Sequence, residues 1–130
     1  WKVAPDGGGG RGRCLVAASD VAPGTLAHSI YGDVVTERHR HRYEFNREFE
    51  KVLTSHGLKI TGESPDRSYV EICEIADHPY YLGCQFHPEF KSKPMEPHPL
   101  FVSFIGAAYE HRQKRLADES TPLFAGETQE

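Results

Sequence analysis

The sequence predicts a single α/β domain in which a layered sheet is flanked by helices. Its 130 residues are a usual length for one domain. A chain of this size buries about two-thirds of the surface that it exposes when unfolded, so it can form a core of its own. Several strand patterns alternate with about three helix patterns, and that mixture favours layered packing.

The charge distribution gives no reason to expect a nucleic-acid partner. Fifteen basic and nineteen acidic residues give a formal net charge of −4. Every charge after Arg115 is acidic, so the body of the chain is neutral and offers no basic patch. No apolar run approaches the roughly 20 residues that span a bilayer, and no charged-then-apolar leader opens the chain. We therefore expect no nucleic-acid partner and no membrane partner.

The cysteines and histidines show no metal-binding spacing. The odd number of cysteines also argues against a disulfide framework, and the expected state is reduced thiols in a cytoplasmic protein. His39 and His41 could be imagined as metal ligands with His98, but no further ligand has a suitable spacing, so no metal site is expected. The three cysteines are Cys14, Cys73 and Cys84.

The first part of the chain predicts a flexible lead-in, a strand and a short helix. Residues 1–12 include a run rich in glycine, which holds neither helix nor strand. The apolar run 15–18 predicts a strand. Thr25 is a suitable N-cap for a helix that continues through Ile30 and ends at Gly32.

The segment 34–44 is predicted to be extended. The period of two in a strand places its side chains alternately on opposite faces. One face would carry Arg38, Arg40 and Arg42, and the other His39, His41 and Tyr43.

The middle of the chain predicts a helix, a strand and a hairpin. Asn46 can cap a helix that ends before Gly57 and that presents Phe49, Val52 and Leu53 on one face. Residues 58–60 predict a strand, and Ser64-Pro65-Asp66 a turn. The segments 70–75 and 80–86 are joined closely enough to form a hairpin. The first alternates apolar with acidic residues like a half-exposed strand, and the second is apolar enough to be buried on both faces.

The last part of the chain predicts one long helix. Prolines between positions 88 and 99 exclude regular helix there. A helix from about Pro99 to Leu116 would place Phe101, Phe104, Ile105 and Ala108 on one face. The domain organisation predicted is a lead-in over 1–12, a folded body over 13–117 and a disordered acidic tail over 118–130.

The segment Gln-Phe-His-Pro-Glu-Phe at 85–90 is the sharpest candidate for chemistry. His87 and Glu89 are two residues apart in extended chain, so both side chains project to the same side. Pro88 fixes one backbone dihedral between them. A carboxylate that holds a histidine in one tautomer creates the base half of a nucleophilic triad. Taken by itself, His-Pro-Glu is a weak signal that favours a surface His–Glu pair in a loop.

The stretch from Ala22 to about Ala108 resembles the glutamine amidotransferase domain, of the class I (triad) kind, of the CTP synthase family. The resemblance rests on blocks spread along the chain, of which Glu-Arg-His-Arg-His-Arg-Tyr-Glu-Phe-Asn at 37–46 is the most specific. The others are Ala-Pro-Gly-Thr-Leu-Ala at 22–27, Gly-x-Ser-Pro-Asp at 62–66, Val-Glu-Ile at 70–72, Asp-His-Pro at 77–79, Gln-Phe-His-Pro-Glu-Phe-Lys-Ser-Lys-Pro at 85–94 and Pro-His-Pro-Leu-Phe at 97–101.

The resemblance implies a partial class I glutamine amidotransferase-like domain that takes part in glutamine hydrolysis. It implies that His87 is the general base, that Glu89 orients His87, and that Arg42 binds the α-carboxylate of glutamine. For Arg38 and Arg40, structural salt bridges are an equally good interpretation. We expect Arg42, His87 and Glu89 to converge on one concave site at the carboxyl ends of the central strands. No cofactor is expected in this chain, because ATP and Mg would bind the ligase domain that aminates UTP.

The sequence contains no Gly-x-Cys-Leu-Gly turn, on which this family carries its nucleophile. The nearest segment, Gly12-Arg13-Cys14-Leu15, has Val16 where the second glycine of such a turn would stand. Three hypotheses follow, in order of preference. The chain is the C-terminal part of a CTP synthase-like glutaminase, and its partner is then the missing N-terminal half or the ligase domain. It is a non-catalytic remnant that serves as a structural or interaction subunit. It is a stand-alone hydrolase that uses Cys14, Cys73 or Cys84.

Overall fold

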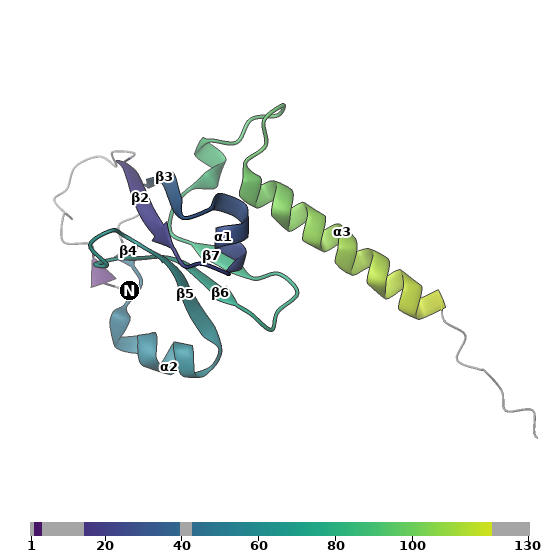
Figure 1. Cartoon of the computed structure of the whole chain (residues 1–130), viewed down its shortest axis with the longest axis horizontal. Coiled ribbons are helices and arrows are strands. Elements are labelled where there is room, and N and C mark those ends of the chain that lie inside the picture. The colour runs from purple at the N-terminus through teal and green to yellow at the C-terminus, as the bar shows by residue number, and fades with distance from the viewer. Residues whose placement is uncertain (1, 4–14, 40–42, 121–130) are drawn as a thin grey trace, which may run out of the picture.

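The chain folds around a five-stranded antiparallel sheet with the strand order β3-β2-β5-β6-β7 (Figure 1). The computed structural model describes residues 2–3, 15–39 and 43–120. The strands of the sheet are β2 (Leu15–Val21), β3 (Val34–His39), β5 (Leu58–Glu63), β6 (Val70–Ile75) and β7 (Leu82–Cys84). Two further short strands, β1 (Lys2–Val3) and β4 (Tyr43–Glu44), pair with each other in a separate sheet.

Within the described residues, three α-helices accompany the sheet, as the sequence predicts. They are α1 (Leu26–Tyr31), α2 (Glu50–Ser55) and α3 (Pro99–Ser120). Single 3-10 turns precede α2 at Arg47–Phe49 and follow β7 at Pro88–Phe90. The predicted α/β class, a layered sheet with flanking helices, is confirmed.

The helix α1 is capped by the residue that the sequence singles out and also by one that it does not. Thr25 Oγ1 accepts a hydrogen bond from the backbone N–H of His28 at 3.2 Å, and Gly32 ends the helix with a φ of 77°. From β6, Glu74 accepts from the backbone N–H groups of Leu26 at 2.9 Å and Ala27 at 2.7 Å. A carboxylate at a helix N-terminus satisfies free donors and complements the helix dipole.

The prediction that segment 70–75 is a half-exposed strand is wrong. Glu71 and Glu74 are both buried. The strand β6 lies inside the sheet between β5 and β7, and each of the two carboxylates contacts a group from another element. Glu74 binds the start of α1, and Glu71 lies beside His39. Alternation of polar and apolar residues reports exposure only when no other element covers the polar face.

The hairpin of β6 and β7 is confirmed, but β7 is not the strand that segment 80–86 predicts. Its pairing with β6 covers only the residues Leu82–Cys84, and β7 is an edge strand of half-buried residues. The prediction of burial on both faces is therefore wrong, since all three residues of β7 are only partly buried. On one edge, β7 pairs with no other described strand. Phe86, just beyond it, is fully inside the core.

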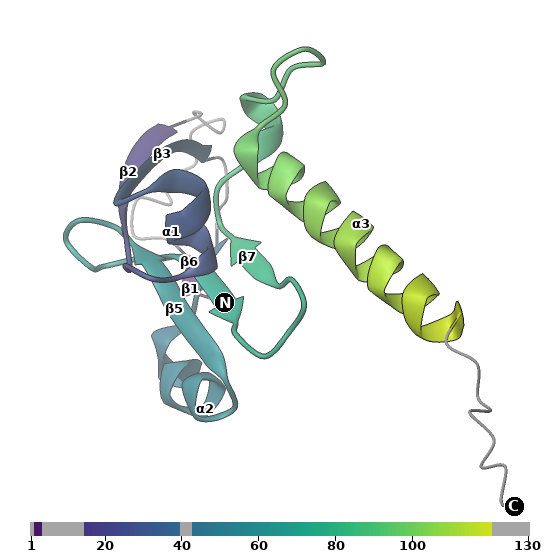
Figure 2. The same cartoon turned by 45° about the vertical axis from the view of Figure 1, so that its right-hand side comes forward.

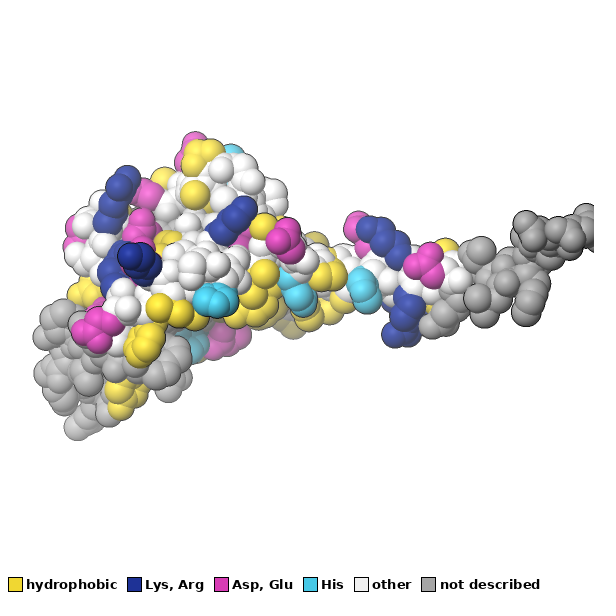
Figure 3. Space-filling view, turned by 90° about the horizontal axis from the view of Figure 1, so that it is seen from below, with side chains coloured by type: hydrophobic (Ala, Val, Ile, Leu, Met, Phe, Trp, Pro, Cys, Tyr) yellow, Lys and Arg dark blue, Asp and Glu magenta, His cyan; other side chains and the backbone are white. Residues whose placement is uncertain are grey.

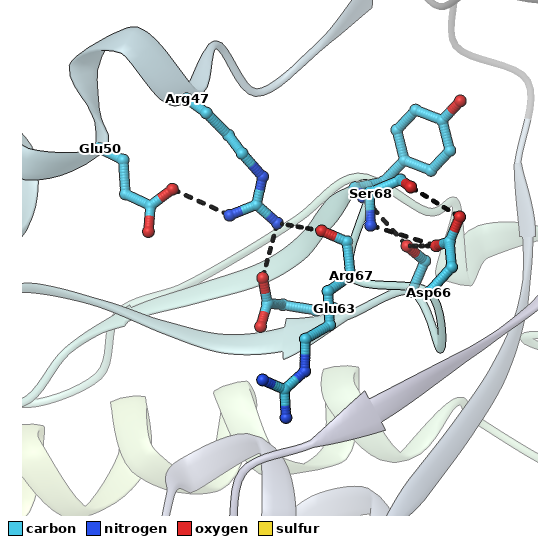
Figure 4. Close-up of polar contacts among 8 residues, drawn as sticks. Arg47, Glu50, Glu63, Asp66, Arg67 and Ser68 are labelled. Atoms are coloured by element: carbon cyan, nitrogen blue, oxygen red, sulfur yellow. Dashed lines mark hydrogen bonds and ion pairs between the residues drawn. The ribbon is translucent and has the colours of Figure 1, made fainter.

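The turn at 64–66 and the start of α2 are fixed by polar contacts (Figure 4). Asp66 accepts hydrogen bonds from Ser64 Oγ at 2.6 Å and from Ser68 Oγ at 2.6 Å, and these bonds lower the pKa of Asp66 to about 2. Arg47 donates to Glu63 at 2.6 Å and to Glu50 at 2.8 Å, as well as to the carbonyl oxygen of residue 67 at 2.7 Å. Arg47 thereby ties the start of α2 to β5 and its turn.

The core lies between α1 and the sheet and is small. Its buried members are Val21, Ala27, Val35, Ile72 and Phe86, against which Tyr31, Leu82 and Cys84 pack.

The long helix α3 leaves this body and extends away from it (Figures 1 and 2). Its first turns contact the rest of the chain, with the ring of Phe104 5.6 Å from that of Tyr80. Ile105 is nevertheless 64% exposed, and hydrophobic side chains lie open where the helix leaves the body (Figure 3). The helix ends at Ser120 rather than at the predicted Leu116. Neither α3 nor any other helix in the described ranges is long and apolar enough to cross a membrane.

Candidate active site

His87 and Glu89 form the hydrogen-bonded pair that their spacing predicts. The distance from His87 Nδ1 to Glu89 Oε1 is 2.8 Å. A carboxylate only accepts hydrogen bonds, so this geometry favours the tautomer with the hydrogen on Nδ1 and leaves Nε2 as an acceptor. Between the two residues, the buried Pro88 begins the 3-10 turn that brings them together. The arrangement is that of a general base with its orienting carboxylate.

The imidazole of His87 is held in place by a stacked ring and by the backbone of β3. The ring of Phe90 stacks on that of His87 with their centroids 5.3 Å apart and an interplanar angle of 28°. The backbone N–H of His87 donates to the carbonyl oxygen of Arg38 at 2.9 Å. Arg38 Cζ lies 5.8 Å from the centre of the Phe90 ring, in a cation–π contact. His87 is 32% exposed and Glu89 56% exposed, so a substrate can reach the pair.

The pair lies beside the end of an edge strand, and not at the carboxyl ends of central strands as predicted. That prediction assumed an open sheet of parallel strands, whose carboxyl ends share one side. Here every pairing in the sheet is antiparallel, and His87 is placed by β3 at the sheet edge.

Four residues that the sequence analysis considers fall outside the described part of the chain. Arg42, the predicted ligand of the α-carboxylate, lies in the undescribed segment 40–42 with Arg40 and His41, and Cys14 lies in 4–14. The segment that leads to Arg42 does approach the His87 turn. His39, three positions earlier, has its ring 6.3 Å from that of Phe86, next to His87 in the chain.

The two described thiols are poorly suited to attack a substrate. Burial raises the pKa of Cys84 to about 12, and Cys84 Sγ donates to the carbonyl oxygen of Phe86 at 3.6 Å. Burial also raises the pKa of Cys73. Because the thiolate is the nucleophile, a raised pKa makes both groups inert at neutral pH.

A buried carboxylate that the sequence did not single out lies near these elements. Glu71 Oε2 is 3.5 Å from His39 Nδ1, and burial, together with the charge of Glu44, raises the pKa of Glu71 to about 7. The only clue in the sequence was the Val-Glu-Ile block, and its alternation suggested exposure instead.

Among the described residues, no three His, Cys, Asp or Glu side chains gather in a way that could hold a metal ion. His98, one of the histidines considered above, uses its Nε2 for a hydrogen bond to Glu37 Oε1 at 2.5 Å. Leu100 donates its backbone N–H to the other nitrogen, Nδ1, so the ring has a structural environment.

An apolar cavity of about 530 Å³ opens between α2 and the strands β6 and β7. It is lined by Phe45, Asn46, Phe49, Val52, Leu53, Val70, Glu71, Ile72, Cys73, Gly83, Cys84 and Gln85. The apolar side of α2 that the sequence predicts faces this cavity and remains largely open, with Phe49 57% and Val52 56% exposed.

The chain belongs to the class I glutamine amidotransferase family, which its residues 14–107 match. The curated relatives that it resembles are CTP synthases. That of Acidobacterium capsulatum is 56% identical over 121 residues, which are 88% of this chain and 22% of the relative. That of Koribacter versatilis is 57% identical over 110 residues, covering 82% of this chain and 20% of the relative.

A solved structure agrees with the sequence relatives. It is described as the glutaminase domain of Trypanosoma brucei CTPS with bound acivicin. It superposes with a TM-score of 0.67 at 36% identity, and the match covers 75% of this chain and 40% of that chain. The resemblance to CTP synthase and the class I amidotransferase fold that the motifs predict are thus confirmed. The chain spans about a fifth of the length of the CTP synthases that it matches.

Proposed function

We propose that this chain is part of a CTP synthase-like glutaminase, which hydrolyses glutamine and supplies ammonia for the amination of UTP to CTP. The observation that carries the proposal is the His87–Glu89 pair, held at 2.8 Å in a chain of the amidotransferase family. The named relatives are CTP synthases, which favours UTP as the ammonia acceptor.

In this proposal His87 Nε2 accepts the proton of an attacking thiol. The thiolate adds to the side-chain amide carbon of glutamine, and the tetrahedral intermediate collapses when His87 returns the proton to the leaving ammonia. This collapse leaves a thioester between the thiol and the glutamyl group. Water, deprotonated by His87, then attacks the thioester, and the thiol departs with the proton that His87 returns, which releases glutamate. Glu89 stabilises the charged imidazole at both stages, and Arg42 binds the α-carboxylate of glutamine as a planar, two-pronged donor.

The thiol and the ligase chemistry are assigned to polypeptide outside these 130 residues. The inert environments of Cys73 and Cys84 support this assignment, and the sequence around Cys14 has Val16 in place of the second glycine of a nucleophile turn. ATP and Mg belong with the ligase domain in the same scheme, as do the UTP contacts. The partner of this chain is then the nucleophile-bearing half of the amidotransferase domain.

A segment exchange tests the proposal. The matching region of the Acidobacterium capsulatum CTP synthase is replaced by this sequence, and ammonia release from glutamine is measured. We expect glutamine-dependent turnover that falls by about 100-fold or more in His87→Ala, the usual contribution of a general base. His56→Ala is the matched control, because His56 is an exposed histidine of the α2 end that bonds only to local groups.

The 130-residue chain on its own should release no ammonia above its His87→Ala variant, since neither of the two described thiols is competent. A well-folded exchange protein without glutaminase activity would contradict the proposal and favour the non-catalytic subunit instead. Turnover by the chain alone that Cys14→Ser abolishes would favour the stand-alone hydrolase.

A further inference from the structure

The segment that carries the His87–Glu89 pair contains little regular structure of its own. Between β7 and α3 it forms one 3-10 turn and an isolated bridge between Lys93 and Glu96. Side chains in such a segment keep a fixed geometry only when neighbouring elements hold them. The elements that support this segment therefore determine the geometry of the His87–Glu89 pair.

Three consecutive residues of β3 supply the support. Arg38 accepts the backbone N–H of His87 at 2.9 Å, and the carbonyl oxygen of Thr36 accepts Lys91 Nζ at 2.7 Å. Between these two residues, Glu37 turns its side chain into the protein, where it is 2% exposed. The backbone of His87 and the side chain of Lys91 are thus both held by one short stretch of β3.

Glu37 contacts this segment at two points, near its middle and at its end. Its Oε1 accepts a hydrogen bond from His98 Nε2 at 2.5 Å, and its Oε2 lies 3.6 Å from Lys91 Nζ. His98 Nδ1 accepts the backbone N–H of Leu100 at 3.2 Å, which leaves the ring hydrogen on Nε2, facing Glu37. Lys91 therefore supplies the positive charge for the buried carboxylate, and His98 supplies the hydrogen bond.

The surroundings of His98 make this anchor rigid. The ring of His98 lies 5.8 Å from that of Tyr31 in α1 and 6.0 Å from that of Phe101 in α3. A buried carboxylate without partners carries a large desolvation cost, so Glu37 favours the one arrangement in which Lys91 and His98 both reach it. Lys91 is two positions from Glu89, and its placement limits where the 3-10 turn can lie.

We propose that Glu37 is a positioning residue for the active site: by holding Lys91 and His98 it fixes the middle and the end of the segment 87–98 on β3 and so sets the geometry of the His87–Glu89 pair. The assignment of a catalytic role to His87 rests on the proposed function, but the positioning itself does not. Glu37 acts through Lys91 and His98, and its contacts with these two side chains involve neither His87 nor Glu89.

The test compares two lysines of the same segment. Lys91→Met removes the ammonium that pairs with Glu37, and the substituted side chain is 44% exposed. Lys93→Met is the matched control, since Lys93 is exposed and pairs only with Glu96 at 2.9 Å. Glu37→Gln keeps the shape and one acceptor but removes the charge. Glu74→Gln controls for the loss of a buried carboxylate that supports α1 instead.

The first readout is the imidazole tautomer of His87, measured by nitrogen NMR on the full chain labelled at histidine. We expect the fraction of Nδ1–H tautomer to fall in Lys91→Met and Glu37→Gln toward the value in Glu89→Ala. Lys93→Met and Glu74→Gln should keep the wild-type value. Loss of stability alone would not move a tautomer ratio in the folded chain.

The second readout is kinetic and uses the segment-exchange enzyme. Lys91→Met should lower kcat about 10-fold with little change in KM, since a small misplacement of the base affects the chemical step most. If the exchange enzyme has no activity in any form, the proposed function fails while the tautomer measurement still decides the role of Glu37. An unchanged His87 tautomer in Lys91→Met overturns the inference, whatever happens to Glu37→Gln.

Discussion

Glu71 is held where its charge is disfavoured, and the stability of the chain should depend on pH because of it. Burial raises the pKa of Glu71 from 4.5 to about 7. Between these two values the folded chain binds a proton that the unfolded chain has already released. Folding is therefore progressively weakened as the pH rises through this window, and above it the carboxylate is charged in both states.

Glu71→Gln should remove this dependence. We expect the variant to be more stable than the wild type by about 2 kcal/mol at pH 8, with the difference shrinking toward zero at about pH 4.5. Urea unfolding at several pH values measures it. Glu96→Gln, at an exposed carboxylate of a loop, should show no such trend. A constant difference across the range would mean that Glu71 is not the titrating group.

At the scale of single residues, the sequence was informative where a motif has one geometric solution. His87 and Glu89 around Pro88 lie as their spacing requires, and Thr25 and Gly32 delimit α1 as predicted. The sequence was uninformative for carboxylates whose partners come from distant elements. Glu74 binds a helix that begins 48 positions away, and Glu37 binds His98 across 61 positions.

At the scale of elements, the register between β5 and β6 depends on a glycine. The pairing is irregular at Gly62, which lies opposite Ile72. A Cβ added at Gly62 would stand 2.7 Å from Ile72 Cγ1, and Ile72 is fully buried in the core. Side chains of the core cannot move aside at that contact without disturbing their neighbours.

Gly62→Ala should therefore destabilise the chain by about 1–3 kcal/mol, the usual cost of overpacking a core. Gly106→Ala, in α3, is the matched substitution, because a Cβ there meets nothing within 4 Å. It should stabilise the helix by up to about 1 kcal/mol through helix propensity alone. Thermal unfolding of both variants gives the comparison, and equal effects would contradict this account of Gly62.

Element types were predictable from the sequence and element surroundings were not. The period of two along 34–39 and the cap of α1 are local properties, and the structure has them. Asn46 caps the 3-10 turn at Arg47–Phe49, whereas α2 itself begins without a side-chain cap. The apolar run from Tyr80 to Phe86 suggested a strand buried on both faces. Hydrophobic content does not distinguish residues that the chain itself buries from residues that only a partner would cover. The edge position of β7 follows from strand order, which the run itself does not encode.

At the scale of the whole molecule, exposed apolar surface and an open sheet edge occur together. β7 is an edge strand, the apolar side of α2 is open, and Phe104 and Ile105 of α3 are 51% and 64% exposed. Such surfaces promote association with other polypeptide chains. This accords with a chain that spans about a fifth of the length of its relatives.

The purified chain should not behave as a 14.6 kDa monomer in size-exclusion chromatography with light scattering. Ile105→Lys, which places a charge on the open side of α3, should shift the population toward the monomer, whereas Lys114→Gln on the same helix should not. Amide exchange over 80–86 should be rapid in the monomer. A sharp wild-type monomer with strong protection of this strand would show that the 130 residues close their own core.

The sheet consists of two local units that meet at a narrow seam. β2 pairs with β3 along six residue pairs, and β6 pairs with its sequence neighbours β5 and β7, whereas β2 and β5 share only the pairs Asp20–Glu63 and Val21–Gly62. Each unit forms by closing short loops, whereas the pairing of β2 with β5 closes the much longer loop between these two strands. Folding therefore favours two early hairpin units that dock late. Because Val21 belongs to the seam and Phe86 and Ile72 lie in the same core cluster, the docking step also completes the core from which the His87 turn emerges.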